Sequence, residues 1–482
     1  MKKLLLLIIL FSTIGASAQY NLKFKVGGLK DTTIFLARYL GDKLYYADTA
    51  ESKNGVIEFN KQFDEGVYTV ICPGPKWFEV ILAEKEVEME TSIDNFITNM
   101  KVKKSVNNKI FYDYIKFINE KKNEAKDKRD DKELMGRLDK EVKAYQKKLV
   151  SENKELLVGK LINMSIDPDI PDDIMKNDTL RYKYYKAHYW DNIDLSDKRL
   201  VHYPAFKNKL EFYFEKMLLQ QPDTICENAH QLISQIEDGS EMFKYVVHFI
   251  TYKYETSKIM GMDAVFYCMG STYYCPPDNS RAFWLDHDKL VELCDRVKAV
   301  GPLRVGQPAP RIILADTTEK NWIDFYTDVK TDYTALIFWA DDCGHCKKEM
   351  PKLIKLYNEL KAKNINIEFV AVGTSLENKG WKKFIKENNL PWINISDFPD
   401  ANEHPEKYLY EKKVTDLKSL NFRKTYDIFS TPQIYLLDKE KVIRAKKLDA
   451  KNLAKMLEHK LSIELDYEEP EEDKKKTDDT HK

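Results

Sequence analysis

The sequence lacks an excess of charge of either sign. Its 482 residues include 77 basic and 78 acidic ones, which leave a formal net charge of −1 at pH 7. Proteins that bind nucleic acid usually carry a strongly basic surface, so this balance argues against a nucleic-acid partner. The 43% of hydrophobic residues is ample for burial, and the length predicts two or three domains rather than one.

Long hydrophobic runs are absent except near the N-terminus. Lys2 and Lys3 precede an apolar run at residues 4–14, and the small residues 16–18 follow it. This order indicates a cleaved signal peptide at residues 1–18, because a spanning helix needs about 20 apolar residues. No cysteine stands at the cleavage site to take a lipid, so we expect no stable membrane insertion after cleavage. The lysine-rich, proline-poor composition suits a Gram-negative bacterium and predicts a periplasmic location.

Ligand patterns of a metal site are missing as well. Zinc and copper sites usually take three or four ligands. Cys343 and Cys346 are accompanied by neither H-x-x-x-H nor a second C-x-x-C, and the nine histidines are scattered. We therefore expect no metal and no cofactor.

Cysteine is scarce, with seven residues in the whole chain. In an oxidising compartment they tend to pair. If Cys343 pairs with Cys346, five remain and at least one is unpaired. Cys268 and Cys275 could form a structural bridge or stay as two buried free thiols. The sequence leaves open how these five pair: Cys72, Cys226, Cys268, Cys275 and Cys294.

The hydrophobic pattern changes period along the chain. Apolar and polar residues alternate at residues 20–91, as in strands, whereas later residues recur at three and four, as on one helix face: Leu134, Leu138, Val142, Tyr145 and Leu149. Strand-like and helix-like segments then alternate, which predicts an α/β domain. We predict a multi-domain chain that consists of a signal peptide (1–18), a small all-β domain (19–100), a mainly α-helical domain (101–300), an α/β domain (301–465) and a disordered charged tail (466–482).

The segment FWADDCGHCKKEMP, residues 338–351, places two cysteines between a predicted strand and a predicted helix. A thiolate is the nucleophile of disulfide exchange, and a helix N-terminus stabilises it. We predict Cys343 as the nucleophile and Cys346, one turn further and more buried, as the resolving thiol. Gly344 permits the tight turn, and His345, when charged, favours the thiolate and tunes the couple.

This segment resembles the active site of the thioredoxin fold, and KKEMP resembles the TlpA/ResA-like periplasmic thiol–disulfide oxidoreductases. FSTPQIYLLD resembles the cis-proline loop of that family. The resemblance covers residues 303–463 and implies a thioredoxin-like domain with a cis bond between Thr431 and Pro432. It also implies that these two residues and Trp339 bind substrate, and that Pro351 kinks the helix. More faintly, the front of the chain resembles multi-domain secreted thioredoxin-like proteins of Bacteroidetes.

Glu349 matches a glutamate that this family places near the thiols, which implies proton exchange with the inner thiol. A solvated charge on the helix face is the alternative. Two residues depart from cytosolic thioredoxins: Ile337 replaces a buried aspartate, and Asp342 replaces the usual tryptophan before the first cysteine. The proton relay and the substrate-facing surface therefore differ from those of thioredoxin.

We predict a periplasmic thiol–disulfide oxidoreductase that acts on protein thiols or disulfides and exchanges electrons with a membrane-bound redox donor or acceptor. The family resemblance implies a reductant, whereas His345 favours oxidation or isomerisation, so the direction of electron flow stays open. Peroxide reduction is disfavoured because the proline and threonine of a peroxidase motif do not precede Cys343. The alternative is an interaction or scaffold protein, whose front domains bind a partner and whose redox domain is accessory.

Overall fold

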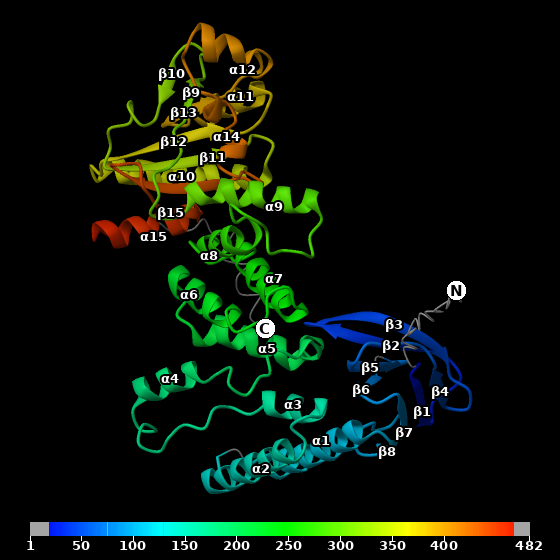
Figure 1. Ribbon diagram of the computed structural model, residues 1–482. Helices are drawn as coiled ribbons and strands as arrows, with labels where there is room; N and C mark the ends of the chain where they lie inside the picture. The colour runs from blue at the N-terminus through cyan, green and yellow to red at the C-terminus, as the bar shows by residue number, and fades with distance from the viewer. Residues whose placement is uncertain (1–18, 75, 129, 467–482) are drawn as a thin grey trace, which may run out of the picture. The chain divides into compact units, whose positions relative to one another are not determined.

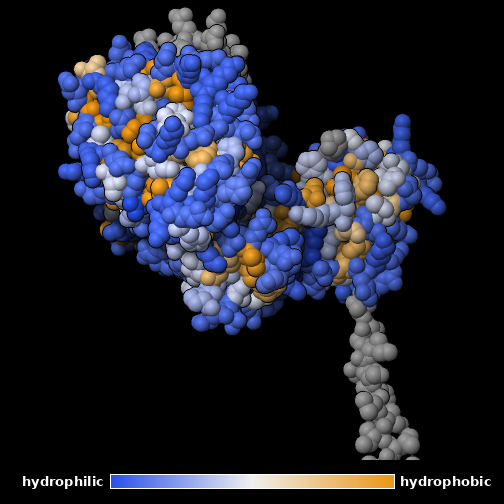
Figure 2. Space-filling view, turned by 90° about the horizontal axis from the view of Figure 1, so that it is seen from above, coloured by the Kyte–Doolittle hydropathy of each residue, from blue (hydrophilic) through white to orange (hydrophobic). Residues whose placement is uncertain are grey.

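The computed structural model describes residues 19–466 except 75 and 129 (Figure 1). The predicted signal peptide and the predicted tail beyond residue 466 lie outside the described residues. Among the described residues, no helix combines the length and the apolar character that crossing a membrane requires. The face in Figure 2 is mostly hydrophilic, with hydrophobic residues in areas between hydrophilic ones.

The chain forms two compact units. One runs to Leu219 and includes Ser234–Tyr245, and the other contains Gln220–Ile233 and the chain from Val246 onward. Each unit is described by itself below.

The first unit begins with two four-stranded sheets, of order β4-β1-β7-β8 and β3-β2-β5-β6. Their strands are β1 (Asn21–Gly27), β2 (Thr33–Leu40), β3 (Lys43–Glu51), β4 (Val56–Phe59), β5 (Gly66–Cys72), β6 (Lys76–Leu82), β7 (Glu86–Ser92) and β8 (Lys101–Lys104). Every second residue of β1 is buried. Phe24 of β1 packs on Phe78 of the other sheet, with ring centroids 5.6 Å apart. The apolar residues of the predicted alternation therefore lie on the face of the sheet that points into the core.

Helices complete the first unit: α1 (Val106–Ala125), α2 (Lys132–Glu152), α3 (Leu157–Met164), α4 (Asp178–Ala187), η1 (Lys198–His202), α5 (Pro204–Glu211) and η2 (Phe212–Met217). Helix α2 begins after Asp131, whose carboxylate accepts a hydrogen bond from the Leu134 N–H and so caps the helix. Leu138 and Leu149 are buried on it, and the other residues of the predicted face are half-buried. The predicted helical face is confirmed.

The second unit contains helices α6 (Pro222–Ile233), α8 (Asp263–Met269), η3 (Gly270–Tyr274), α9 (His287–Val300) and η4 (Gly301–Leu303), and helix α7 (Glu241–Glu255) spans the boundary between the units. Two disulfides join them, Cys226–Cys268 and Cys275–Cys294. Both expectations for Cys268 and Cys275, a bridge between them and two buried free thiols, are therefore wrong. Cys268 lies where α8 packs on α6, whereas Cys275 follows η3 beside α9.

Cys72 is the cysteine that remains in the first unit. It is buried and free, and burial raises the pKa of its thiol to about 11. Because only the thiolate reacts readily, Cys72 is an inert core residue.

A seven-stranded sheet of order β10-β9-β13-β12-β11-β14-β15 forms the rest of the second unit. Its elements are β9 (Ile313–Asp316), β10 (Trp322–Asp324), β11 (Tyr333–Trp339), α10 (Gly344–Ala362), β12 (Ile367–Gly373), α11 (Asn378–Asn388), β13 (Ile393–Ser396), α12 (Pro399–Glu403), η5 (Lys407–Glu411), α13 (Leu417–Leu420), α14 (Phe422–Thr425), β14 (Gln433–Asp438), β15 (Ile443–Leu448) and α15 (Ala450–Leu461). β11 pairs in parallel with β12 and antiparallel with β14.

Both faces of this sheet are covered, as the alternation of strands and helices predicts. Ala335, Ile337 and Trp339 of β11 point into a core that α10, α11 and α15 cover. Leu336 and Phe338 point into a second core on the opposite face, which α12, α13 and α14 help to close. β11 is therefore a buried interior strand, and its carboxyl end leads directly to the cysteine pair.

Candidate active site

Helix α10 begins directly after Cys343, which is its N-cap residue. The Cys343 sulfur accepts a hydrogen bond from the Cys346 N–H at 3.4 Å. The first N–H groups of a helix have no partner inside the helix, so a sulfur anion at this position satisfies them and meets the positive end of the helix dipole. The strand β11 behind it and the helix ahead of it fix this placement, as the sequence predicts.

The two sulfurs of this pair lie in different environments. Both cysteines are free thiols; Cys343 is partly exposed, and Cys346 is fully buried. Burial alone would raise the pKa of Cys343, but hydrogen bonds with the side chains of Thr431 and Cys346 and with the backbone N–H groups of Cys346 and His345 lower it below the ordinary value. Burial raises the pKa of Cys346 to about 12. The outer sulfur therefore ionises first.

The loop before β14 lies beside the outer sulfur. The peptide bond between Thr431 and Pro432 is cis, as the family resemblance implies. The Cys343 thiol donates to the Thr431 carbonyl oxygen at 3.2 Å. Because Phe338 of β11 pairs with Gln433 of β14, the sheet brings this loop next to the start of α10.

The other residues predicted for the site lie at different depths. Gly344 and His345 are exposed on the first turn of α10. Trp339 is fully buried, and its ring lies 5.1 Å from that of Phe384. The indole of Trp339 therefore faces the core rather than a docked protein. Ile337, in the place of the thioredoxin aspartate, is also fully buried.

Glu349 points toward the start of α15. Its side chain is 12% exposed and lies 3.9 Å from the Lys352 ammonium, and one carboxylate oxygen accepts a hydrogen bond from the Ala450 N–H. A carboxylate is stabilised at a helix N-terminus. These contacts exclude a fully solvated charge on the helix face.

An ion pair behind the site had no signal in the sequence. Arg423 of α14 donates to both carboxylate oxygens of Asp397, at 2.6 and 2.8 Å, and to the Thr374 carbonyl oxygen at 2.9 Å. The next residue, Ser375, donates to Asp341 at 2.6 Å. Arg423 therefore fixes the loop after β12, which holds the segment just before Cys343. These residues are far apart in the sequence, so no local spacing could have connected them.

Family comparisons divide the chain into three matched regions. Residues 330–441 match the family described as Thioredoxin-like. Residues 20–111 match a domain of unknown function, DUF4369, and residues 119–300 match another, DUF5106.

Individual relatives match a part of the chain. The thiol-disulfide oxidoreductase ResA of Bacillus thuringiensis subsp. konkukian is 29% identical over 143 residues, which are 30% of this chain and 69% of that protein. ResA of Bacillus subtilis is 37% identical over 70 residues, 14% of this chain and 38% of that protein. Among solved structures, a domain of a possible thiol-disulfide isomerase from Cytophaga hutchinsonii is 35% identical and matches 34% of this chain and 96% of its own, with a TM-score of 0.27. A thioredoxin-like protein from Bacteroides caccae is 20% identical, with 61% and 97% covered and a TM-score of 0.43.

Proposed function

Because the chain is a thioredoxin-like thiol–disulfide oxidoreductase of the TlpA/ResA-like type, we propose that Cys343 and Cys346 are its redox couple, with Cys343 as nucleophile and Cys346 as resolving thiol. One observation carries this assignment above the others. The hydrogen bonds around Cys343 lower the pKa of its partly exposed thiol, whereas burial raises the pKa of Cys346 to about 12.

The proposed reaction transfers two electrons in two exchange steps. The Cys343 thiolate attacks one sulfur of a substrate disulfide; the Cys343–substrate disulfide forms, and the other substrate sulfur leaves as a thiolate and takes a proton. Cys346 then loses its proton and attacks the Cys343 sulfur, which forms the Cys343–Cys346 disulfide and releases the second substrate thiol. The reverse sequence oxidises a substrate dithiol, so the same atoms serve either direction.

Residues around the couple support this chemistry. We propose that Thr431 and Pro432 bind the substrate chain, because Thr431 lies in hydrogen-bonding contact with Cys343. Trp339 is buried, so we propose that it does not contact the substrate and that it supports the base of the site by packing. Gly344 and His345 are proposed to tune the couple.

Glu349 and two exposed side chains have further proposed roles. Glu349 would take up the proton of the inner thiol, a role supported by the low exposure of its carboxylate. Phe429, two residues before Thr431, and Leu376, directly after Ser375, are 78% and 66% exposed. Exposed apolar residues of this kind suit the docking of a protein substrate.

The wider setting is also part of the proposal. We propose a periplasmic protein that exchanges electrons with a membrane-bound redox partner and is organised into the domains given above, at residues 19–100, 101–300 and 301–465. An accessory redox domain on a scaffold is the second candidate. The exposed aromatic residues Tyr45 and Tyr46 on β3, 54% and 72% exposed, favour a partner for the first unit.

A trapping experiment tests the proposed division of labour. In the Cys346→Ser variant, the first exchange step can occur but the second cannot, because no thiol remains to attack the mixed disulfide. We expect disulfide-linked adducts on Cys343 that a reductant releases, detected by non-reducing electrophoresis and mass spectrometry of the linked peptides.

The Cys343→Ser/Cys346→Ser double variant is the matched control and should trap nothing. Equal trapping by both variants would reject Cys343 as the nucleophile. Adducts that form on Cys346 in the Cys343→Ser variant and on no residue in the Cys346→Ser variant would reverse the assignment.

A further inference from the structure

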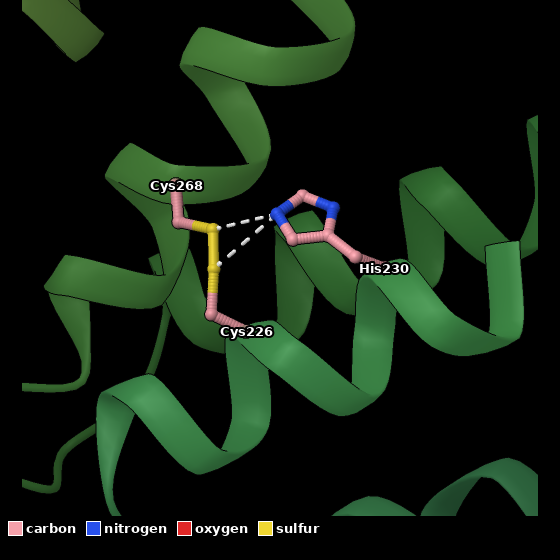
Figure 3. Close-up of side chains that lie close together, drawn as sticks. All are labelled: Cys226, His230 and Cys268. Carbon is pink, nitrogen blue, oxygen red and sulfur yellow. Dashed lines mark hydrogen bonds between the residues drawn. A yellow bond between two sulfur atoms is a disulfide. The ribbon is translucent and has the colours of Figure 1, made fainter. Parts of the chain in front are cut away.

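A second group of sulfur and nitrogen ligands lies in the helical part of the second unit, apart from the Cys343 pair in sequence. Cys226 and His230 are four residues apart on α6, so they share one face of that helix. Cys268 on α8 faces them, and the three side chains converge (Figure 3). Their candidate ligand atoms all lie within 4.8 Å of one another, and all three residues are partly exposed.

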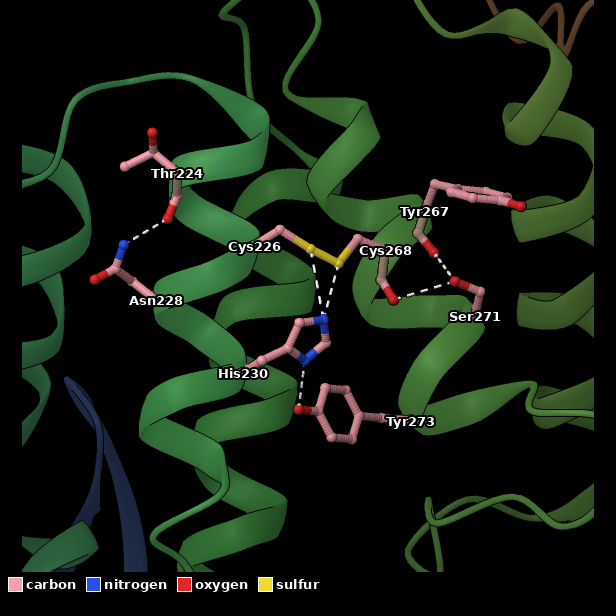
Figure 4. Close-up of a disulfide and its surroundings, with 8 residues drawn as sticks. All are labelled: Thr224, Cys226, Asn228, His230, Tyr267, Cys268, Ser271 and Tyr273. Carbon is pink, nitrogen blue, oxygen red and sulfur yellow. Dashed lines mark hydrogen bonds between the residues drawn. A yellow bond between two sulfur atoms is a disulfide. The ribbon is translucent and has the colours of Figure 1, made fainter.

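One nitrogen of His230 points at both sulfurs. Nε2 lies 3.2 Å from the Cys268 sulfur and 3.6 Å from the Cys226 sulfur. The opposite nitrogen, Nδ1, is 2.7 Å from the Tyr273 hydroxyl, as Figure 4 shows. In metal sites, the second ring nitrogen of a histidine ligand commonly makes a hydrogen bond that fixes the orientation of the ring. Tyr273 is therefore placed to fix the ring so that Nε2 faces the sulfurs.

We propose that Cys226, His230 and Cys268 form a redox-controlled zinc site, which is a disulfide when oxidised and holds Zn²⁺ when reduced. Two thiolates and one imidazole are ligands that zinc prefers, and three protein ligands leave one tetrahedral position for water. The sequence predicts no metal because it contains neither H-x-x-x-H nor a second C-x-x-C beside Cys343 and Cys346. Cys226-x-x-x-His230 is a third spacing, and its partner Cys268 comes from another helix.

The distances suit this ion. Two ligands at about 2.3 and 2.0 Å from a tetrahedral zinc ion lie about 3.5 Å apart, close to the two nitrogen–sulfur distances of 3.2 and 3.6 Å. The Cα atoms of Cys226 and Cys268 are 6.6 Å apart. Reduction breaks the bond between the two sulfurs, which then have to move apart to about 3.8 Å, the separation of two thiolates on a tetrahedral zinc ion.

Reduction of the disulfide and binding of Zn²⁺ are two separate steps. A dithiol reductant gives two electrons and two protons to the Cys226–Cys268 disulfide, becomes a disulfide itself and leaves two cysteine thiols. Zn²⁺ then binds both sulfurs and Nε2, and the two thiol protons go to solvent. In reoxidation, a disulfide oxidant takes two electrons from the two thiolates and two protons from solvent and becomes a dithiol, while the Cys226–Cys268 disulfide forms and Zn²⁺ is released.

Zinc titration of the full chain from residue 19 tests the proposal. The Cys343→Ser/Cys346→Ser background removes the other candidate thiol pair, and a phosphine reductant is removed before the titration. Zn²⁺ is added in competition with a chromophoric chelator. We expect one equivalent to bind the reduced protein and none to bind the oxidised protein. Co²⁺ as a second probe should show the absorption of a tetrahedral thiolate complex.

Variants of His230 and Tyr273 show whether zinc binds at this site or at other thiols of the chain. His230→Gln keeps both cysteines and should weaken zinc binding about 100-fold or more, and Tyr273→Phe should weaken it about 10-fold. Cys275→Ser/Cys294→Ser, the matched control, removes the other disulfide and should leave one equivalent bound. Circular dichroism of each oxidised and reduced protein establishes that it is folded before zinc is added.

Three results would overturn the proposal. The first is that the His230→Gln variant and its parent bind zinc with equal affinity. The second is that the reduced parent binds no zinc at micromolar concentration. The third is that the Cys275→Ser/Cys294→Ser control loses the bound equivalent. A reduced parent that unfolds and binds no zinc counts with the second result.

Discussion

The Cys343→Ser variant is expected to reduce a disulfide-bonded protein at least about 1,000-fold more slowly than the unchanged chain, because serine supplies neither a readily ionised group nor a sulfur for the mixed disulfide. The loss should fall on the first exchange step. Single-turnover kinetics with the pre-reduced protein and excess substrate disulfide measure this step directly.

A cysteine outside the site provides the matched control. Cys72→Ala removes a buried free thiol of the first unit and should leave the rate unchanged, since the pKa of about 11 keeps that thiol protonated. A Cys343→Ser variant that retains more than about a tenth of the activity would show that another thiol performs the attack. An equal loss in Cys72→Ala would point to a general defect in folding.

The second large effect is on stability. Arg423→Met is expected to lower the free energy of unfolding of the thioredoxin-like domain by about 3 kcal/mol, because it leaves the Asp397 carboxylate buried without its partner. Asp397 has no exposed surface, and the Arg423 side chain is 28% exposed. Because Arg423 is partly exposed, we expect a loss at the lower end of the range of destabilisation that follows when one partner of a buried ion pair is removed. Hydrogen exchange of peptides from β11 and β12 at increasing denaturant concentration measures the free energy of unfolding of this domain within the full chain.

An exposed ion pair in the same domain serves for comparison. Lys383 and Glu387 on α11 lie 3.8 Å apart and are 72% and 61% exposed. Lys383→Met should cost about 0.5 kcal/mol or less, because water screens such pairs. If Arg423→Met costs no more than Lys383→Met, the buried pair does not hold the loop after β12 in place.

Local patterns predicted the elements that carry the candidate couple. The apolar run through Trp339 and the charged helix after Cys346 specify a strand and a helix by their period, so the position of Cys343 at the helix start followed from the sequence. The face of α2 that includes Leu138 and Leu149 followed in the same way. Such features depend on neighbours within a few residues.

Contacts between distant segments could not be predicted in this way. The pairing of Cys226 with Cys268 joins two helices whose packing no spacing specifies, and the contact of Arg423 with Asp397 joins residues that are distant in the sequence. Strand β3 does not show the alternating burial predicted for residues 20–91, because its side chains, such as Tyr45 and Tyr46, are mostly exposed. The burial of Trp339 likewise depends on α11, which covers it.

The pH dependence of alkylation at Cys343 tests the central claim most directly. The reduced, folded chain is treated with iodoacetamide over a range of pH, and mass spectrometry follows Cys343 and Cys346 separately, with the urea-unfolded chain as reference. The lowered pKa of Cys343 predicts a rate midpoint at lower pH in the folded chain than in the unfolded one, whereas the burial and the raised pKa of Cys346 predict slow alkylation at every pH at which the chain stays folded. A Cys343 midpoint at or above that of the unfolded chain would contradict the account.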